Sequence, residues 1–226
     1  MEPWFGLSPA TMIYNEAIAG GWLKQPANAW TNVFYLLNAL ALFVFYIKDR
    51  KRQLALTFGV ISFLIGLSSF LYHASNTFFF QYFDLASMYL LSGLLAALVL
   101  VRLGFVQPRR WLIVFLSVFA GSSVLLFIIR GKSGAIIFGI EVILILLLEG
   151  RTRMKSRRKT LYRNLLYALA LFVVSFVFWV LDYNGLIFSP GNHLIQGHGL
   201  WHILNSFCFV FLYLFYRQFD KKEIGL

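Results

Sequence analysis

Charged residues and cysteine are scarce in this chain of 226 residues. Only 13% of the residues are charged, whereas soluble domains usually carry about 25%. A single cysteine, Cys208, excludes a disulfide framework and a thiolate metal cluster, so histidine and carboxylate groups must hold any metal. Residues 1–26 contain Glu2 and Glu16 and lack a basic start followed by an apolar run, which argues against a cleavable signal peptide. The first apolar segment is then expected to act as the targeting signal.

Apolar residues make up most of the sequence. The chain is 60% hydrophobic and its mean hydropathy is +0.74, which indicates an integral membrane protein. A helix needs about 20 apolar residues to cross a bilayer, with a range of about 17–25. Segments of this kind cover residues 28–47, 54–74, 81–101, 111–129, 134–149, 161–181 and 198–216. The predicted fold is all-α, a bundle of seven transmembrane helices in a single domain that covers residues 1–226.

Basic residues are distributed unevenly between the loops. All of them except Lys24, Arg130 and Lys132 follow the first, third or fifth apolar segment or lie near the C-terminus. These are Lys48, Arg50, Lys51, Arg52, Arg102, Arg109, Arg110, Arg151, Arg153, Lys155, Arg157, Arg158, Lys159, Arg163, Arg217, Lys221 and Lys222.

Because basic loops stay cytoplasmic, residues 1–26 are predicted to form an outer N-terminal segment and residues 217–226 a cytoplasmic tail. An odd number of spans agrees with that orientation. The net charge of +11 then serves as a topology signal that also contacts anionic lipid. A nucleic-acid partner is not expected, because the basic clusters are split among separate loops.

Five polar residues are predicted to lie at one level, near the outer face. His73 ends the second segment, Asp84 begins the third, Asp182 ends the sixth, and His198 and His202 begin the seventh. The last two are four residues apart and so share one face of a helix.

Ser69 lies one turn from His73 on the same face and can direct its hydroxyl to whatever His73 binds. Three histidines and a water form the open, catalytic type of zinc site, in which the water becomes a nucleophile near neutral pH. Asp84 is then a candidate proton acceptor, and Ser69 a candidate hydrogen-bond donor to the water or the oxyanion. A competing interpretation of Asp84 is an acid in the first helical turn, favoured by the helix dipole. His193 is interpreted as an ordinary loop residue.

The combination of Ser69-x-x-x-His73, Asp84 and His198-x-x-x-His202 across seven segments resembles the alkaline ceramidase family. Its superfamily also contains adiponectin receptor-like and GPI-remodelling membrane hydrolases. Residues 25–32, QPANAWTN, are similar to the Pro-x-Asn-Thr-Trp-Ser-Asn stretch of bacterial members, and residues 14–16, YNE, stand where the family has an acidic element. Residues 178–182 at the end of the sixth segment also resemble the family.

The resemblance implies a zinc-dependent amidase that acts on a sphingolipid-like membrane lipid. His73, His198 and His202 would hold Zn²⁺, and Ser69 and Asp84 would assist. Relatives from eukaryotes have a calcium site built by N-terminal acids.

Calcium is not expected here, because of those acids only Glu16 clearly remains and Gln25 replaces another. Asp182 and Glu16 are possible partners of the ligand histidines, although Asp182 fits a solvated helix end equally well. In a bacterium the chain would lie in the inner membrane with its site near the outer face.

Other functions remain open on the sequence alone. They are a non-enzymatic receptor or structural-zinc protein, a lipid esterase of the same superfamily, and a metal or proton transporter. The oligomeric state is not predicted. Glu141, within the fifth segment, receives no role and is interpreted as structural. Trp179 and Trp201 are assigned to an aromatic belt at the outer interface.

Overall fold

The computed structural model describes residues 4–48, 52–129, 133–155 and 159–226. The secondary structure of this part of the chain is helical, apart from one isolated bridge between Pro9 and Thr77. Its elements are α1 (Pro26–Trp30), α2 (Val33–Lys48), α3 (Arg52–Ser75), α4 (Phe78–Arg102), η1 (Pro108–Arg110), α5 (Trp111–Ile129), α6 (Ser133–Lys155), α7 (Arg163–Tyr183), α8 (Gly197–Tyr216) and α9 (Lys221–Ile224).

Each of the seven predicted segments corresponds to a helical region, so the all-α prediction is confirmed. In the described residues, six helices are long and apolar enough to cross a membrane, which makes this an integral membrane protein. The helix outside that set is α6, predicted as the short fifth span. It has 23 residues, but Glu141 and Glu149 interrupt its apolar stretch and Arg151 follows. The seventh span therefore stays a prediction.

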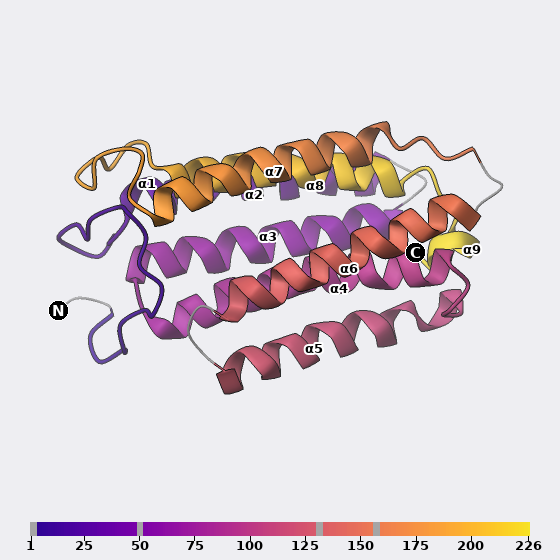
Figure 1. Ribbon diagram of the computed structural model, residues 1–226, viewed down its shortest axis with the longest axis horizontal. Coiled ribbons are helices and arrows are strands. Elements are labelled where there is room, and N and C mark those ends of the chain that lie inside the picture. The colour runs from indigo at the N-terminus through magenta and orange to yellow at the C-terminus, as the bar shows by residue number, and fades with distance from the viewer. Residues whose placement is uncertain (1–3, 49–51, 130–132, 156–158) are drawn as a thin grey trace.

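The long helices run roughly along one direction and enclose an interior lined by several of them (Figure 1). The pair α7 and α8 and the pair α2 and α3 pack closely, α4 contacts α3, α5 and α6, and α8 also reaches α2 and α3. Helix α5 lies at the outer edge of the bundle, where mostly exposed apolar side chains suit contact with lipid. The N-terminal segment, α1 and the loop before α8 gather at one end, and α9 lies at the other.

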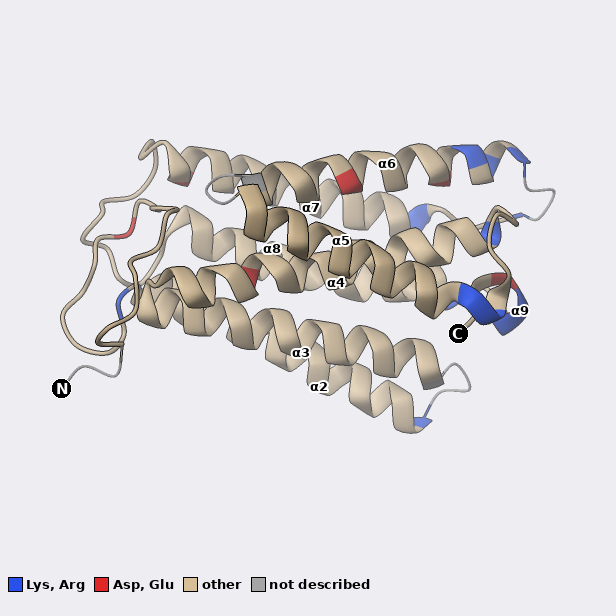
Figure 2. Cartoon of the chain, turned by 90° about the horizontal axis from the view of Figure 1, so that it is seen from below, with Lys and Arg blue, Asp and Glu red and all other residues tan. Residues whose placement is uncertain are grey.

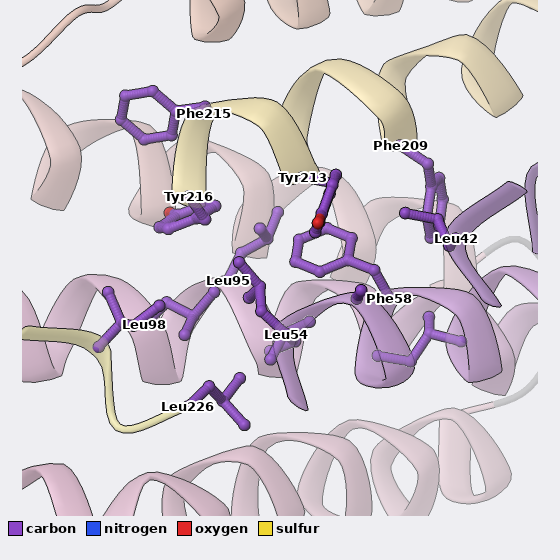
Figure 3. Packing of buried hydrophobic residues seen from close by; sticks show 14 of the residues in the cluster. Leu42, Leu54, Phe58, Leu95, Leu98, Phe209, Tyr213, Phe215, Tyr216 and Leu226 are labelled. Atoms are coloured by element: carbon purple, nitrogen blue, oxygen red, sulfur yellow. The ribbon is translucent and has the colours of Figure 1, made fainter. Parts of the chain in front are cut away.

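Aromatic packing fixes α8 against its neighbours in the half of the bundle nearer α9. Figure 3 shows Tyr213 and Phe209 of α8 beside Phe58 of α3 and Leu42 of α2. The rings of Phe58 and Tyr213 have centroids 6.1 Å apart in an edge-on arrangement, a geometry that aromatic pairs prefer. This packing anchors the helix whose other end carries His198 and His202.

Apart from Lys24, whose backbone N–H donates to the Ala74 carbonyl at the end of α3, the described Lys and Arg residues gather at the end of the bundle opposite the N-terminus (Figure 2). This matches the charge pattern on which the predicted orientation rests. The basic residues Arg50, Lys51, Arg130, Lys132, Arg157 and Arg158 lie outside the described residues. Which face is cytoplasmic stays a prediction.

The predicted tail, residues 217–226, packs back onto the bundle. Phe219 and Ile224 are buried, and the Arg102 guanidinium lies 3.8 Å from the centroid of the Phe219 ring. Arg102 also forms a buried ion pair with Glu149 of α6, at 2.6 Å. The sequence pattern missed this docking because it treated the segment as a charged terminus.

The predicted helix at residues 28–47 is broken after Trp30 into α1 and α2. The Thr31 hydroxyl donates to the carbonyl oxygens of Ala27 and Asn28, and the Asn32 side chain also donates to the Asn28 carbonyl. Side chains that bind nearby carbonyl groups in this way compete with the helical ladder. The break has a consequence for the candidate site, because the Asn28 carbonyl also contacts His202.

Candidate active site

Three histidines come together at the end of the bundle that carries the N-terminal segment. His73 lies in the last turn of α3, whereas His198 and His202 lie in the first two turns of α8. All three are buried, and one potential ligand atom from each lies within 4.8 Å of the others. Nε2 of His198 is 3.1 Å from Nε2 of His73. These three residues can hold a metal ion.

A close approach between two helices sets the position of His198. Gly197 opens α8 against α7, and a Cβ atom at this position would lie 2.9 Å from the Phe178 carbonyl oxygen. Asp182 also belongs to this junction, since its Cβ atom would lie 2.9 Å from a Cβ atom at Gly197. The absence of a side chain at Gly197 therefore permits the close contact between α7 and α8.

The outward-facing nitrogens of two histidines are tied to oxygen acceptors. Nδ1 of His73 lies 2.7 Å from Oε1 of Gln25, and Nδ1 of His202 lies 3.1 Å from the Asn28 carbonyl oxygen. Because both partners are acceptors, each Nδ1 carries the hydrogen and each Nε2 keeps its lone pair. Metal-binding histidines in proteins are generally oriented in this way.

This tautomer assignment gives a test of whether the residues fit a metal. With Nδ1 protonated on His73, its Nε2 presents a lone pair towards Nε2 of His198 at 3.1 Å. Two imidazoles in such a contact must share a proton or direct both lone pairs to a cation. Three neutral nitrogen ligands around one point match the catalytic type of zinc site. The residues therefore fit a zinc ion.

Ser69 and Asp84 lie next to the histidine cluster, as the sequence predicts. The Ser69 hydroxyl is 3.4 Å from Nε2 of His202 and also hydrogen-bonds the Asp84 side chain. Asp84 is not part of the group of ligand atoms that the described residues bring together. It thus reaches the cluster through Ser69, and a metal held by the three histidines would have no protein ligand from Asp84.

The competing interpretation of Asp84 as a first-turn acid is wrong. Helix α4 begins at Phe78, so Asp84 lies beyond the first turn and is buried. The dipole of the first turn does not explain a buried acid there, because that effect falls off within one turn.

Asp182 and Glu16, the two possible partners of the histidines, contact backbone groups instead of imidazoles. Asp182 is fully buried rather than solvated, and it also accepts a hydrogen bond from the backbone N–H of Asn15 at 3.3 Å. Glu16 accepts the backbone N–H groups of Ala27 and Asn28, both at 2.9 Å. Glu16 therefore holds the start of α1, and Asp182 holds the N-terminal segment next to Tyr14.

The Glu16 carboxylate is surrounded by hydrogen-bond donors. Besides the two N–H groups at the start of α1, Nδ1 of His193 lies 3.0 Å from Oε1 of Glu16, so His193 is more than an ordinary loop residue. The backbone carbonyl of Glu16 accepts a hydrogen bond from Gln25. A Ca²⁺ ion takes about six to eight oxygen ligands, and the N–H donors around this carboxylate do not fit that requirement.

A long cavity begins at the histidine cluster and continues between α4, α6, α7 and α8. Its walls include Ser69, Asp84, His198 and His202 at one end and Glu149 and Tyr216 at the other. Along α8 the distance from His202 to Tyr216 is about 21 Å at a rise of about 1.5 Å per residue. Most of the lining between the two ends is apolar, as in Leu95, Phe138, Val142, Leu169, Phe172 and Leu212. The shape and chemistry suit a hydrocarbon chain.

Two tryptophans assigned to the outer belt belong to this cavity instead. Trp179 of α7 and Trp201 of α8 both line its wall near the histidines, and their ring centroids are 6.4 Å apart. The sequence predicts only how deep in the membrane these two residues lie. A helix position does not reveal whether a side chain at that depth faces lipid or the interior.

Glu141 lies outside the residues that line the cavity. Its carboxylate accepts hydrogen bonds from Ser92 of α4, at 2.5 Å, and from Ser122 of α5. These contacts link three helices and agree with the structural interpretation.

Sequence reasoning also missed Tyr14, Gln25 and Asn28 as neighbours of the histidines. The Tyr14 ring stacks on His198 with centroids 3.7 Å apart, and the other two bind His73 and His202 as described above. Residues 14–16 and 25–32 carry the family resemblance, which was the available signal, but Asn28 acts through its backbone and has no signature in a side-chain pattern.

Comparison with known protein families places this geometry in context. The model of the family described as ceramidase matches residues 25–224, a range that includes the three histidines, Ser69 and Asp84. No curated protein sequence matches the chain.

Proposed function

The chain belongs to the ceramidase family, and from this premise we propose that it is a zinc-dependent hydrolase of lipid amides in the membrane. It would cleave a ceramide-like lipid into a fatty acid and a sphingoid-type amine. The observation that carries this proposal is the buried cluster of His73, His198 and His202 at the end of an apolar cavity, with Ser69 and Asp84 beside it.

The donor set supports zinc as the metal. His73, His198 and His202 would supply three nitrogen ligands, and Ser69 and Asp84 line the adjoining cavity together with His198 and His202. A zinc ion in such an open site supplies Lewis acidity and activates water at neutral pH.

Asp84 and Ser69 divide the remaining chemistry between them. The Asp84 carboxylate accepts the proton of the attacking water and then delivers it to the nitrogen of the departing amine, so that the C–N bond breaks and the carboxylate is regenerated. The Ser69 hydroxyl donates to the negative charge that develops on the carbonyl oxygen. The hydrogen bond between Ser69 and Asp84 keeps both groups at one side of the cluster.

The cavity gives the place for the hydrocarbon part of the substrate. We assign the acyl chain to the apolar stretch between the histidines and Tyr216, which is about 21 Å long at about 1.5 Å per residue. The partner of the protein is thus a lipid of the bilayer itself, and the site lies near the outer face.

The alternative functions differ in what they require of this site. A structural zinc site is normally closed by four protein ligands, whereas the group of described ligand residues here has three. An esterase would use the same groups, so the choice between amide and ester depends on measurement.

The direct test uses purified, zinc-loaded protein and a panel of lipid pairs. Each pair shares its acyl chain and differs in an amide or ester link, and released fatty acid is measured by mass spectrometry. The proposal predicts release from amides, loss of release after chelation, and recovery on addition of zinc. Absence of release from every amide would overturn it, and preferential release from esters would replace it with the esterase function.

A further inference from the structure

Tyr14 is a buried aromatic residue whose ring contacts a histidine of the candidate metal centre. Its ring stacks on His198 with centroids 3.7 Å apart and an interplanar angle of 23°. Tyr14 also lines the cavity together with Ser69 and Asp84. A phenol so close to the proposed reaction centre is a candidate contact for the substrate.

The chain on both sides of Tyr14 is fixed. Before it, the carbonyl oxygen of Met12 accepts a hydrogen bond from the Tyr72 hydroxyl at 3.0 Å. After it, the Asn15 side chain donates to the carbonyl oxygen of Ile187 at 3.2 Å. These contacts belong to α3 and to the loop before α8, so Tyr14 is held over the cavity although it lies in no helix.

The hydroxyl group of Tyr14 has one partner that fixes its direction. The side chain of Trp179, on the α7 wall of the cavity, forms a hydrogen bond with it. Because an indole N–H can only donate, the phenol oxygen accepts this bond and its own hydrogen is available to another acceptor. An ordinary phenol has a pKa of about 10 and keeps this hydrogen at neutral pH.

The position of Tyr14 separates its role from that of Ser69. Ser69 approaches the cluster from α3 beside His202, whereas Tyr14 lies beside His198 and turns towards Trp179 on α7. The two residues therefore contact different histidines of the cluster. The carbonyl group of a substrate would meet Ser69, and Tyr14 would meet the part of the lipid next to it.

The charge of the cavity restricts that part of the lipid. Among the described residues that line the cavity none is Lys or Arg, so a phosphate group next to the amide would find no cationic side chain. Neutral donors such as the Tyr14 and Ser69 hydroxyls suit an uncharged oxygen instead. A hydroxyl oxygen is an acceptor of this kind.

We propose that Tyr14 is a specificity residue that donates a hydrogen bond to a hydroxyl oxygen of the lipid, adjacent to the scissile amide. The protein would accordingly select amides of amino alcohols over the same amides without the hydroxyl. This inference rests on the proposed function for its reaction, but the binding preference can be measured separately.

The test compares two lipid amides that are identical except for a hydroxyl on the carbon next to the amine-bearing carbon. Wild type and Tyr14→Phe are measured for kcat/KM and for thermal stabilisation by each lipid. A lost hydrogen bond to a buried partner corresponds to roughly a 5- to 150-fold effect. We expect a loss of that size for Tyr14→Phe on the hydroxylated amide, and little change on its deoxy counterpart.

Two controls separate this role from a structural one. Tyr14→Phe retains the ring on His198, so its zinc content should equal that of wild type, and Tyr167→Phe removes the hydroxyl of an exposed tyrosine on α7. An equal loss on both amides, or an unchanged preference in Tyr14→Phe, would overturn the inference. If wild type binds the hydroxylated amide selectively and Tyr14→Phe does not, yet neither releases fatty acid, the proposed reaction fails while the assignment of Tyr14 stands.

Discussion

Each histidine of the cluster is supported by a different kind of neighbour. The Gln25 side chain accepts from His73, the Asn28 backbone accepts from His202, and the Tyr14 ring covers His198. All three supports come from the N-terminal segment and α1. The cluster on α3 and α8 is thus oriented by a part of the chain outside these two helices.

Removal of the Gln25 acceptor should weaken metal binding. In Gln25→Leu the buried Nδ1–H of His73 loses its partner, and loss of such a partner generally lowers metal affinity by about 10- to 100-fold. Competition with a chelator of known affinity measures the effect. Gln107→Leu, at an exposed glutamine near the other end of the bundle, should leave the affinity unchanged. Equal zinc affinity in Gln25→Leu and wild type would show that this hydrogen bond does not orient His73.

The sequence was sufficient to find the residues that carry the proposed chemistry, but not their supports. His198 and His202 are recognisable by their spacing, and His73 by its depth, because regular helices fix both quantities. The contact between His202 and the Asn28 carbonyl depends on a helix break and on backbone atoms, and these leave no pattern of residue types.

At the scale of elements, the helices that form the cavity place its two ends in different chemical environments. Helix α8 connects them, from His202 beside the cluster to Tyr216 near the ion pair of Arg102 and Glu149. A hydrocarbon chain gains nothing from contact with that buried ion pair. The polar end therefore sets a limit to the length of chain that the cavity accepts.

A bulky residue midway along the cavity should shift the chain-length preference. Leu212 lines the wall ten residues beyond His202 on α8, which is about 15 Å at about 1.5 Å per residue. Leu212→Trp should lower the hydrolysis of long-chain amides about tenfold or more and spare short-chain amides. The measurement is kcat/KM for a series of acyl lengths on one amine.

The matched control is Leu166→Trp, on the exposed face of α7. It adds the same side chain to a surface that suits contact with lipid, so the chain-length profile should stay as in wild type. A uniform loss across all acyl lengths in Leu212→Trp would place the acyl chain elsewhere.

The helix boundaries show which parts of the fold an apolar sequence pattern can predict. The helices follow the predicted segments closely because a membrane span needs a continuous apolar run. The break between α1 and α2 and the docking of α9 escaped the pattern. Both depend on specific hydrogen bonds or ring contacts, of Thr31 and Asn32 in one case and of Phe219 in the other.

At the scale of the whole molecule, charge and chemistry lie at opposite ends. Apart from Lys24, the described basic residues lie at the end of the bundle that carries α9 (Figure 2), whereas the histidine cluster lies near the N-terminal segment. Because basic ends of membrane proteins remain cytoplasmic, the cluster is predicted to face the outer side.

Cysteine accessibility tests this orientation. Cys208 is buried, and Cys208→Ala gives a background without cysteine. Single cysteines are then introduced as Leu194→Cys, in the exposed loop before α8, and as Lys155→Cys, at the exposed end of α6. A membrane-impermeant maleimide applied to intact cells should label the first and spare the second. The reverse pattern would place the cluster at the cytoplasmic face.

The most direct test of the account separates metal binding from catalysis. Purified wild type, His202→Ala and Asp84→Asn are each measured for zinc content and for fatty-acid release from a ceramide-like amide. We predict an equimolar amount of zinc in wild type and in Asp84→Asn, loss of zinc and activity in His202→Ala, and activity in Asp84→Asn lowered by about 10²- to 10⁴-fold. Loss of zinc in Asp84→Asn, or full activity in that variant, would contradict the assignment of a three-histidine site assisted by Asp84.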